Sequence, residues 1–299
     1  MIKKYNKVFV YLSLVFLVLA LYRANYIYVP LIYRKDFLLV SFSFLFMGFI
    51  FDAVCWKNIL NKSNTDINML ESLSSVGLSV FGKYIPGVIW SVVGRVTYIA
   101  GRNHSTVPTL STISLKAQFL QLWTGIVLGL VGLLLLNNSI YSIWLYIPIV
   151  ILLTLVTFTN TFNKPANYIL KKRLKMNIII TDFHILEIFQ ILPYYLIQWL
   201  WWTISFTFFV SSLSHLSINF VVGLAFPLAG TFGILAIGIP GGVGIREGVL
   251  FLYLKLCGLS VADALTISVT SRLWFLLGEF FIFILGVVSN LFLKKSEKN

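Results

Sequence analysis

Long stretches of almost uninterrupted apolar residues dominate this chain and leave little sequence between them. A transmembrane helix needs about 20 consecutive apolar residues. Runs of spanning length lie at about 8–24, 37–56, 109–136, 140–161, 183–210 and 266–293. Only 11% of the 299 residues are charged, whereas soluble domains average roughly 25%. A soluble enzyme, a secreted disulfide scaffold and a disordered chain are therefore excluded. We predict an all-α polytopic membrane helix bundle with about six full spans, forming one domain over residues 1–299.

The basic residues predict how these spans are oriented. The formal net charge is +13, and lysine and arginine crowd the loop at 163–177 and the chain end after residue 293. Such clusters mark the cytoplasmic side, so we expect an uncleaved first span and both termini in the cytoplasm. Arg23, Arg34 and Lys35 oppose this assignment but are outnumbered. Because orientation accounts for the positive charge, we expect no nucleic-acid partner.

Two further segments, at about 70–101 and 217–260, are interrupted by glycine and proline. With six full spans and both termini on one side, neither segment adds a net crossing, so each is expected to form a re-entrant or broken helical hairpin. Entry from opposite sides is the pattern of an inverted repeat, which places a binding site where the two elements meet. The string Ile-Pro-Gly occurs in both, at 85–87 and 239–241, and an arginine follows each copy within about ten residues.

The strongest local signal for a binding site is the stretch IPGGVGIREG at 239–248. Its proline ends a helix, and glycines such as Gly242 and Gly244 permit backbone turns that other residues resist. A helix that restarts near Arg246 would offer free N–H groups and the positive end of its dipole beside a guanidinium, which suits a phosphate. The alternative is a kinked helix in which Arg246 and Glu247 pair with other spans.

The first broken segment contains two further cations. Lys83 lies before its interruption and Arg95 after it. Arg95 either binds a lipid phosphate or extends to the cytoplasmic interface together with Arg102. Both interpretations are compatible with the sequence.

Acidic residues inside the apolar runs are candidates for charge pairs or proton coupling. A charge at the bilayer centre costs at least about 2.5 kcal/mol, so such groups face the protein interior and have partners. We expect Glu279 to pair with Arg246 or with Arg272, which lies two helical turns earlier on the same face, or to take up a proton during transport. Asp52 and Glu187 lie nearer the predicted membrane surfaces and are expected to act as interfacial caps.

No pattern in the sequence predicts a metal, a cofactor or redox chemistry. Cys55 and Cys257 lie far apart, and the three histidines are scattered without ligand spacing. An aromatic run near the end of the fifth span predicts a belt at the membrane interface. Its members are Trp199, Trp201, Trp202 and Phe206.

Two strings identify a family resemblance. GKYIPGVIW at 82–90, followed by Gly94 and Arg95, and PGGVGIRE at 240–247 resemble the membrane region of lysylphosphatidylglycerol synthases and the related flippase-like UPF0104 family. This resemblance implies a bundle with two re-entrant elements that moves a lipid-linked polar headgroup between the leaflets of a bacterial or archaeal plasma membrane. The full-length synthases carry an added soluble aminoacyl-transferase domain. Because this chain stops soon after its last span, we expect no tRNA-dependent transfer here.

The main functional hypothesis is therefore a lipid flippase rather than an enzyme, with anionic phospholipid or a lipid-linked saccharide as the ligand. In this hypothesis Arg246 holds the phosphate, Gly242, Gly244, Arg95 and Lys83 contribute to the headgroup site, and Glu247 and Glu279 position the arginines or take up a proton. Two alternatives are an intramembrane transferase acting on a polyprenyl phosphate, and a non-catalytic partner of glycosyltransferases in surface-glycan synthesis. The sequence does not define an oligomeric state.

Overall fold

The computed structural model describes residues 30–85, 90–102, 105–136, 140–159, 185–214, 219–236 and 239–296. Throughout these ranges the chain forms helices joined by short connections, without a strand. The predicted first span at 8–24 and the basic loop at 163–177 lie outside the described residues. The Pro-Gly pair at 86–87 also lies outside them.

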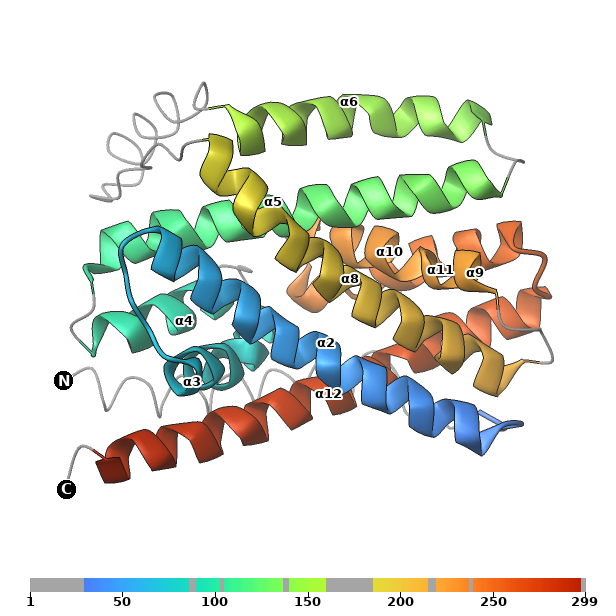
Figure 1. The fold of residues 1–299 in the computed structure, drawn as a ribbon. Helices are drawn as coiled ribbons and strands as arrows, with labels where there is room; N and C mark the ends of the chain where they lie inside the picture. The colour runs from blue at the N-terminus through green and yellow to red at the C-terminus, as the bar shows by residue number, and fades with distance from the viewer. Residues whose placement is uncertain are drawn as a thin grey trace.

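Long apolar helices form the body of the molecule, as predicted (Figure 1). Four are long enough to cross a membrane: α2 (Lys35–Lys62), α5 (Val107–Leu135), α8 (Ile185–Leu213) and α12 (Val261–Ser296). The apolar helix α6 (Ile140–Phe158) lies beside α5 along one side of the bundle. Such helices satisfy their own backbone hydrogen bonds, as a lipid environment requires. The chain is therefore a multi-pass membrane helix bundle.

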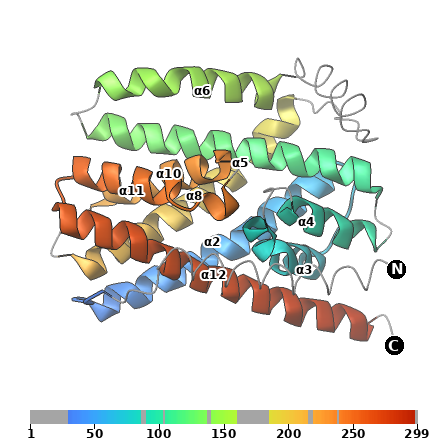
Figure 2. The ribbon, with the colours of Figure 1, turned by 180° about the vertical axis from the view of Figure 1, so that it is seen from behind.

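Both Gly- and Pro-interrupted segments are broken helical hairpins. The first consists of α3 (Met69–Ser79), the short 3-10 helix η1 (Val80–Tyr84) and α4 (Trp90–Ala100). The second consists of α9 (Phe220–Gly223), α10 (Ala225–Leu235), η2 (Pro240–Gly242) and α11 (Ile245–Leu256). They lie towards opposite ends of the bundle, α3 and α4 at one end and α10 and α11 at the other (Figures 1 and 2). Their tips, η1 and η2, contact each other between them.

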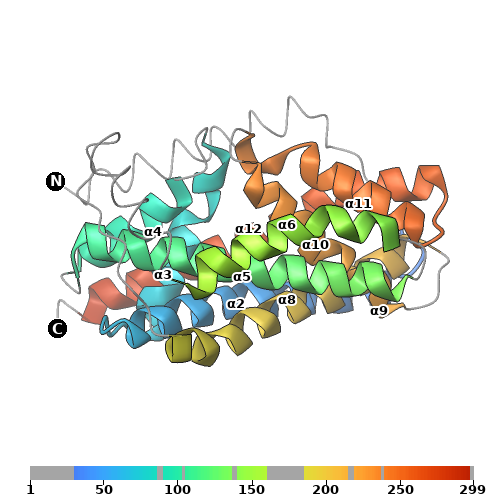
Figure 3. The same ribbon diagram turned by 90° about the horizontal axis from the view of Figure 1, so that it is seen from above.

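Helix α12 contacts α3 of the first hairpin and α11 of the second, because it runs along the length of the bundle (Figure 1). Figure 3 shows the same two hairpins from above. The contact of α12 with α3 is made at two glycines. A Cβ atom on Gly77 would lie 2.3 Å from the carbonyl oxygen of Ile282 and 2.8 Å from the Cα atom of Gly286. Small residues allow such close backbone approach, the usual basis of helix association in membranes.

Substitution of Gly77 by valine should destabilise the protein, because the added methyl groups must push α3 away from α12. Overpacking of this kind costs about 1–3 kcal/mol. We expect a lower melting temperature in detergent, measured by loss of the monodisperse peak in size-exclusion chromatography after heating. Gly248→Ala is the matched control, since a Cβ there meets no atom within 4 Å. Equal melting temperatures for wild type and Gly77→Val would contradict this account of the helix contact.

The predicted interfacial belt on α8 is wrong for most of its members. Trp199, Trp202 and Phe206 are buried, with at most 5% of each side chain exposed. Trp202 packs edge-on against Trp199, with ring centroids 5.3 Å apart. The rings are buried because this face of α8 is turned into the bundle, where Trp202 packs against Phe49 of α2 and Phe226 of α10. Trp201 is half-buried.

Candidate functional site

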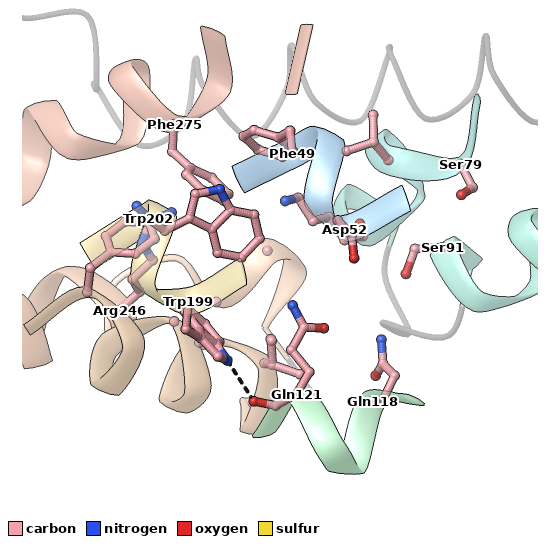
Figure 4. Close-up of a pocket in the computed structure, with 18 of the residues that line it drawn as sticks. Phe49, Asp52, Ser79, Ser91, Gln118, Gln121, Trp199, Trp202, Arg246 and Phe275 are labelled. Atoms are coloured by element: carbon pink, nitrogen blue, oxygen red, sulfur yellow. Dashed lines mark hydrogen bonds between the residues drawn. The ribbon is translucent and has the colours of Figure 1, made fainter. Parts of the chain in front are cut away.

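A cavity of about 180 Å³ lies where the two hairpin tips meet α2, α5, α8 and α12 (Figure 4). Four cations from four different elements line it: Lys83 of η1, Arg95 of α4, Arg246 of α11 and Arg272 of α12. Figure 4 shows Arg246 among aromatic side chains on one side of the cavity, and Asp52, Ser91, Gln118 and Gln121 on the other. The sequence predicted a site where the two broken segments meet, and their cations do converge on this cavity.

Arg246 is the cation with the fewest polar contacts in the cavity. Its side chain is 6% exposed and lies between two rings, with the guanidinium carbon 4.9 Å from the Phe226 centroid and 4.8 Å from that of Phe275. One guanidinium nitrogen lies 3.5 Å from the carbonyl oxygen of Ser271, and Nε has no hydrogen-bond partner. Within the described residues Arg246 forms no ion pair. The buried guanidinium therefore keeps donor capacity that the described residues do not use.

The turn before Arg246 brings the hairpin tip into backbone contact with α10. Gly241, Gly242 and Gly244 have φ angles of +61°, +64° and +86°, a region that glycine adopts readily. A Cβ on Gly242 would lie 2.5 Å from the carbonyl oxygen of Gly233 and 2.6 Å from its Cα atom. Helix α11 then begins at Ile245, in agreement with the predicted helix restart. This close contact sets the position of Arg246.

Glu247 occupies the N-terminus of α11 that the sequence suggested for a phosphate. One of its carboxylate oxygens accepts a hydrogen bond of 2.7 Å from the Gly244 N–H. The other lies 3.7 Å from a guanidinium nitrogen of Arg272, which also donates to the Gly241 carbonyl at 2.8 Å. The Gly241 carbonyl at the tip is thereby satisfied within the protein, as a membrane interior requires.

Glu279 pairs with the other hairpin, and this corrects the pairing expected from the sequence. The carboxylate is 1% exposed and forms an ion pair of 2.5 Å with the Lys83 ammonium. It also accepts a hydrogen bond of 2.9 Å from the Tyr84 hydroxyl. Arg272 and Glu279 do share one face of α12, as predicted. They hold two different hairpin tips because η2 lies over Arg272 and η1 over Glu279.

Arg95 and Asp52 form the third charge pair of the cavity. Their nitrogen and oxygen atoms are 3.2 Å apart, and the other oxygen of Asp52 accepts from Gln198 at 3.2 Å. The guanidinium of Arg95 also lies over the Trp56 ring, 5.2 Å from its centroid. Asp52 is therefore part of the cavity wall and forms a charge pair there, which is one of the two roles, beside an interfacial cap, that the sequence allowed for it. Arg95 thus lines the cavity, whereas Arg102 pairs with Glu71 at 2.9 Å.

Several polar cavity residues were not singled out from the sequence. Gln118 and Gln121 project from α5, Ser91 from α4 and Tyr195 from α8. The spacing of the two glutamines was an available signal, because residues three apart share a helix face and this span is otherwise largely apolar. Among the described residues, no three His, Cys, Asp or Glu side chains gather as metal ligands would.

Comparison with known proteins gives one finding of similarity. A sequence model of the family described as "Lysylphosphatidylglycerol synthase TM region" matches residues 7–286 of the chain. The match includes both hairpins and every cavity residue named above. No curated protein and no solved structure matches the chain.

Proposed function

Because the chain belongs to the lysylphosphatidylglycerol synthase transmembrane-region family, we propose that it is a flippase-like protein that moves a phosphate-bearing lipid headgroup between leaflets. One observation carries this proposal. Arg246 is buried in a cavity at the junction of two broken hairpins, and within the described residues it has no acidic partner. Burial of an unpaired charge is costly unless a ligand of opposite charge is bound for part of the cycle.

Charge balance around the cavity supports an anionic ligand. Three acids contact three of the four cations: Asp52 contacts Arg95, Glu247 contacts Arg272, and Glu279 contacts Lys83. Arg246 is the fourth cation of the described cavity, and none of these three acids contacts it. In this proposal it binds the phosphate, while Glu247 and Glu279 act as positioning residues that hold the two hairpin tips on α12.

The arrangement of the hairpins suits movement across a bilayer. Broken helices that enter from opposite sides and meet at the midplane leave a polar site that either side can reach when one hairpin moves. In this proposal the hairpins at 69–100 and 220–256 are re-entrant, they form an inverted repeat, and both termini are cytoplasmic. The charge pairs on α12 would then be the contacts that change between the inward-open and outward-open states.

We expect Arg246→Gln to lower the translocation rate about ten- to hundredfold, since hydrogen bonds to charged groups contribute roughly 1.5–3 kcal/mol. The assay uses proteoliposomes that contain a fluorescent short-chain phosphatidylglycerol. The rate at which the inner-leaflet label becomes accessible to dithionite is compared with that of empty liposomes. Arg34→Gln is the matched control, because Arg34 is exposed at the start of α2. A folded Arg246→Gln protein that translocates at the wild-type rate would refute the assignment.

A further inference from the structure

The cavity has two chemically different sides, and the phosphate accounts for only one of them. Figure 4 shows Arg246 with Trp199, Trp202 and Phe275 on one side. Across the cavity, the side chains of Gln118 and Gln121 rise from α5 towards Asp52 and Ser91 (Figure 4). A ligand with its phosphate at Arg246 therefore places the rest of its headgroup against carboxamides and hydroxyls.

Gln118 and Gln121 are suited to bind hydroxyl groups. Each carboxamide offers an oxygen that accepts and an NH₂ group that donates, which matches a hydroxyl that does both. Within the described residues neither side-chain amide is engaged in a hydrogen bond, and both line the cavity. The Trp199 indole, at 2.9 Å, and the Thr124 hydroxyl, at 3.1 Å, both donate to the backbone carbonyl of Gln121 and leave its side-chain amide unengaged. Two side-chain amides without a protein partner are costly to place inside a helix bundle unless they serve such a contact.

The cavity is a poor site for an amine in the headgroup, because its carboxylates already contact cations. An ammonium group has three donors, no acceptor and a full positive charge, so in a buried site it needs a carboxylate. The acids around the described cavity are already in contact with cations: Asp52 with Arg95, Glu279 with Lys83, and Glu247, at the longer distance of 3.7 Å, with Arg272. Gln198 further occupies the second oxygen of Asp52. A positive charge on the ligand would also be repelled by Arg246, the cation that these acids leave without a contact.

We propose that the lipid carries, beyond its phosphate, a hydroxyl-rich headgroup without an amine, such as glycerol or a sugar, whose hydroxyls bind Gln118 and Gln121. This inference rests on the proposed function, because it assumes a phosphate at Arg246. It assigns the α5 side of the cavity as the subsite that sets headgroup specificity. An aminoacylated headgroup, which the family description names for its synthases, is then disfavoured for this chain.

Three short-chain phosphodiester lipids that differ only in the alcohol esterified to the phosphate test the inference in the full-length wild-type protein. They are dioctanoyl phosphatidylglycerol, phosphatidylethanol and phosphatidylethanolamine, titrated calorimetrically into the detergent-solubilised protein. Two hydrogen bonds predict that phosphatidylglycerol binds about tenfold more tightly than phosphatidylethanol. Phosphatidylethanolamine should bind most weakly. Equal or tighter binding of phosphatidylethanolamine would overturn the proposal.

Substitution of both glutamines tests whether Gln118 and Gln121 bind the headgroup hydroxyls. Gln118→Met with Gln121→Met keeps the side-chain length and removes the hydrogen bonds, so the preference for phosphatidylglycerol over phosphatidylethanol should fall to about twofold or less. Gln190→Met, at an exposed position of α8, should leave that preference unchanged. If the double variant does not fold, each single variant should lose about half of the preference on a logarithmic scale.

A folded double variant that keeps the wild-type preference for phosphatidylglycerol refutes the subsite. If none of the three lipids binds the wild-type protein, the proposed function itself fails.

Discussion

Lys83→Met should lower the free energy of unfolding by about 3–5 kcal/mol, the range measured when one partner of a buried ion pair is removed. The reason is the asymmetry of the pair. Glu279 is 1% exposed, whereas the Lys83 side chain is 31% exposed and borders the cavity. Without Lys83, the Glu279 carboxylate keeps the Tyr84 hydroxyl as its remaining recorded contact. Unfolding by sodium dodecyl sulfate in mixed micelles measures the change.

The difference in exposure between Glu279 and Lys83 also predicts the result of substituting Glu279 instead of Lys83. Glu279→Gln should be milder, because an amide oxygen still accepts from Tyr84 and Lys83 remains beside a polar cavity. The double variant should be more stable than Lys83→Met alone, since it no longer buries a charge without a counter-ion. Lys62→Met, at an exposed position, controls for the loss of a lysine. Failure of Glu279→Gln to restore stability would show that this pair does not hold η1 on α12.

The sequence predicted the architecture well because apolar run length and helix-breaking residues are local signals. The boundaries of α2, α5, α8 and α12 lie close to the predicted spans. The interruption at Pro240 and its glycines separates α10, which already ends at Leu235, from α11, which begins at Ile245. These features follow from backbone chemistry that needs no knowledge of neighbours. Orientation in the membrane depends partly on the loop at 163–177, which lies outside the described residues.

Pairing among the charges could not be predicted in the same way. Seven-residue spacing correctly placed Arg272 and Glu279 on one helix face, but spacing within one helix gives no information about which hairpin packs over each turn.

The prediction of an interfacial belt from the aromatic run on α8 was wrong for a similar reason. Tryptophans near the end of a span fit an interface or a packed core equally well by composition, and the small residues of α10 decide between them. Gly230 leaves room for the Trp199 ring, because a Cβ there would lie 2.9 Å from it.

Gly242→Ala should have the second large effect, through strain and collision at one position. Its φ of +64° costs an L-residue about 1–2 kcal/mol. The added Cβ would also lie 2.5 Å from the Gly233 carbonyl oxygen, a backbone atom that cannot rotate away. We expect a total loss of stability of about 2–5 kcal/mol. We also expect loss of phosphatidylglycerol binding in the fraction that folds, because the collision displaces Arg246 from its place between Phe226 and Phe275.

Gly244→Ala separates these two causes within the same turn. Gly244 has a φ of +86°, yet a Cβ there meets no atom within 4 Å. Its N–H still donates to Glu247 after the substitution. Gly244 has a ψ of −44°, so Gly244→Ala should cost only a conformational term of about 1–3 kcal/mol and retain most lipid binding. If both variants lose binding equally, backbone strain alone controls the site. If Gly242→Ala alone loses it, the contact between the hairpin tip and α10 is what places the guanidinium of Arg246.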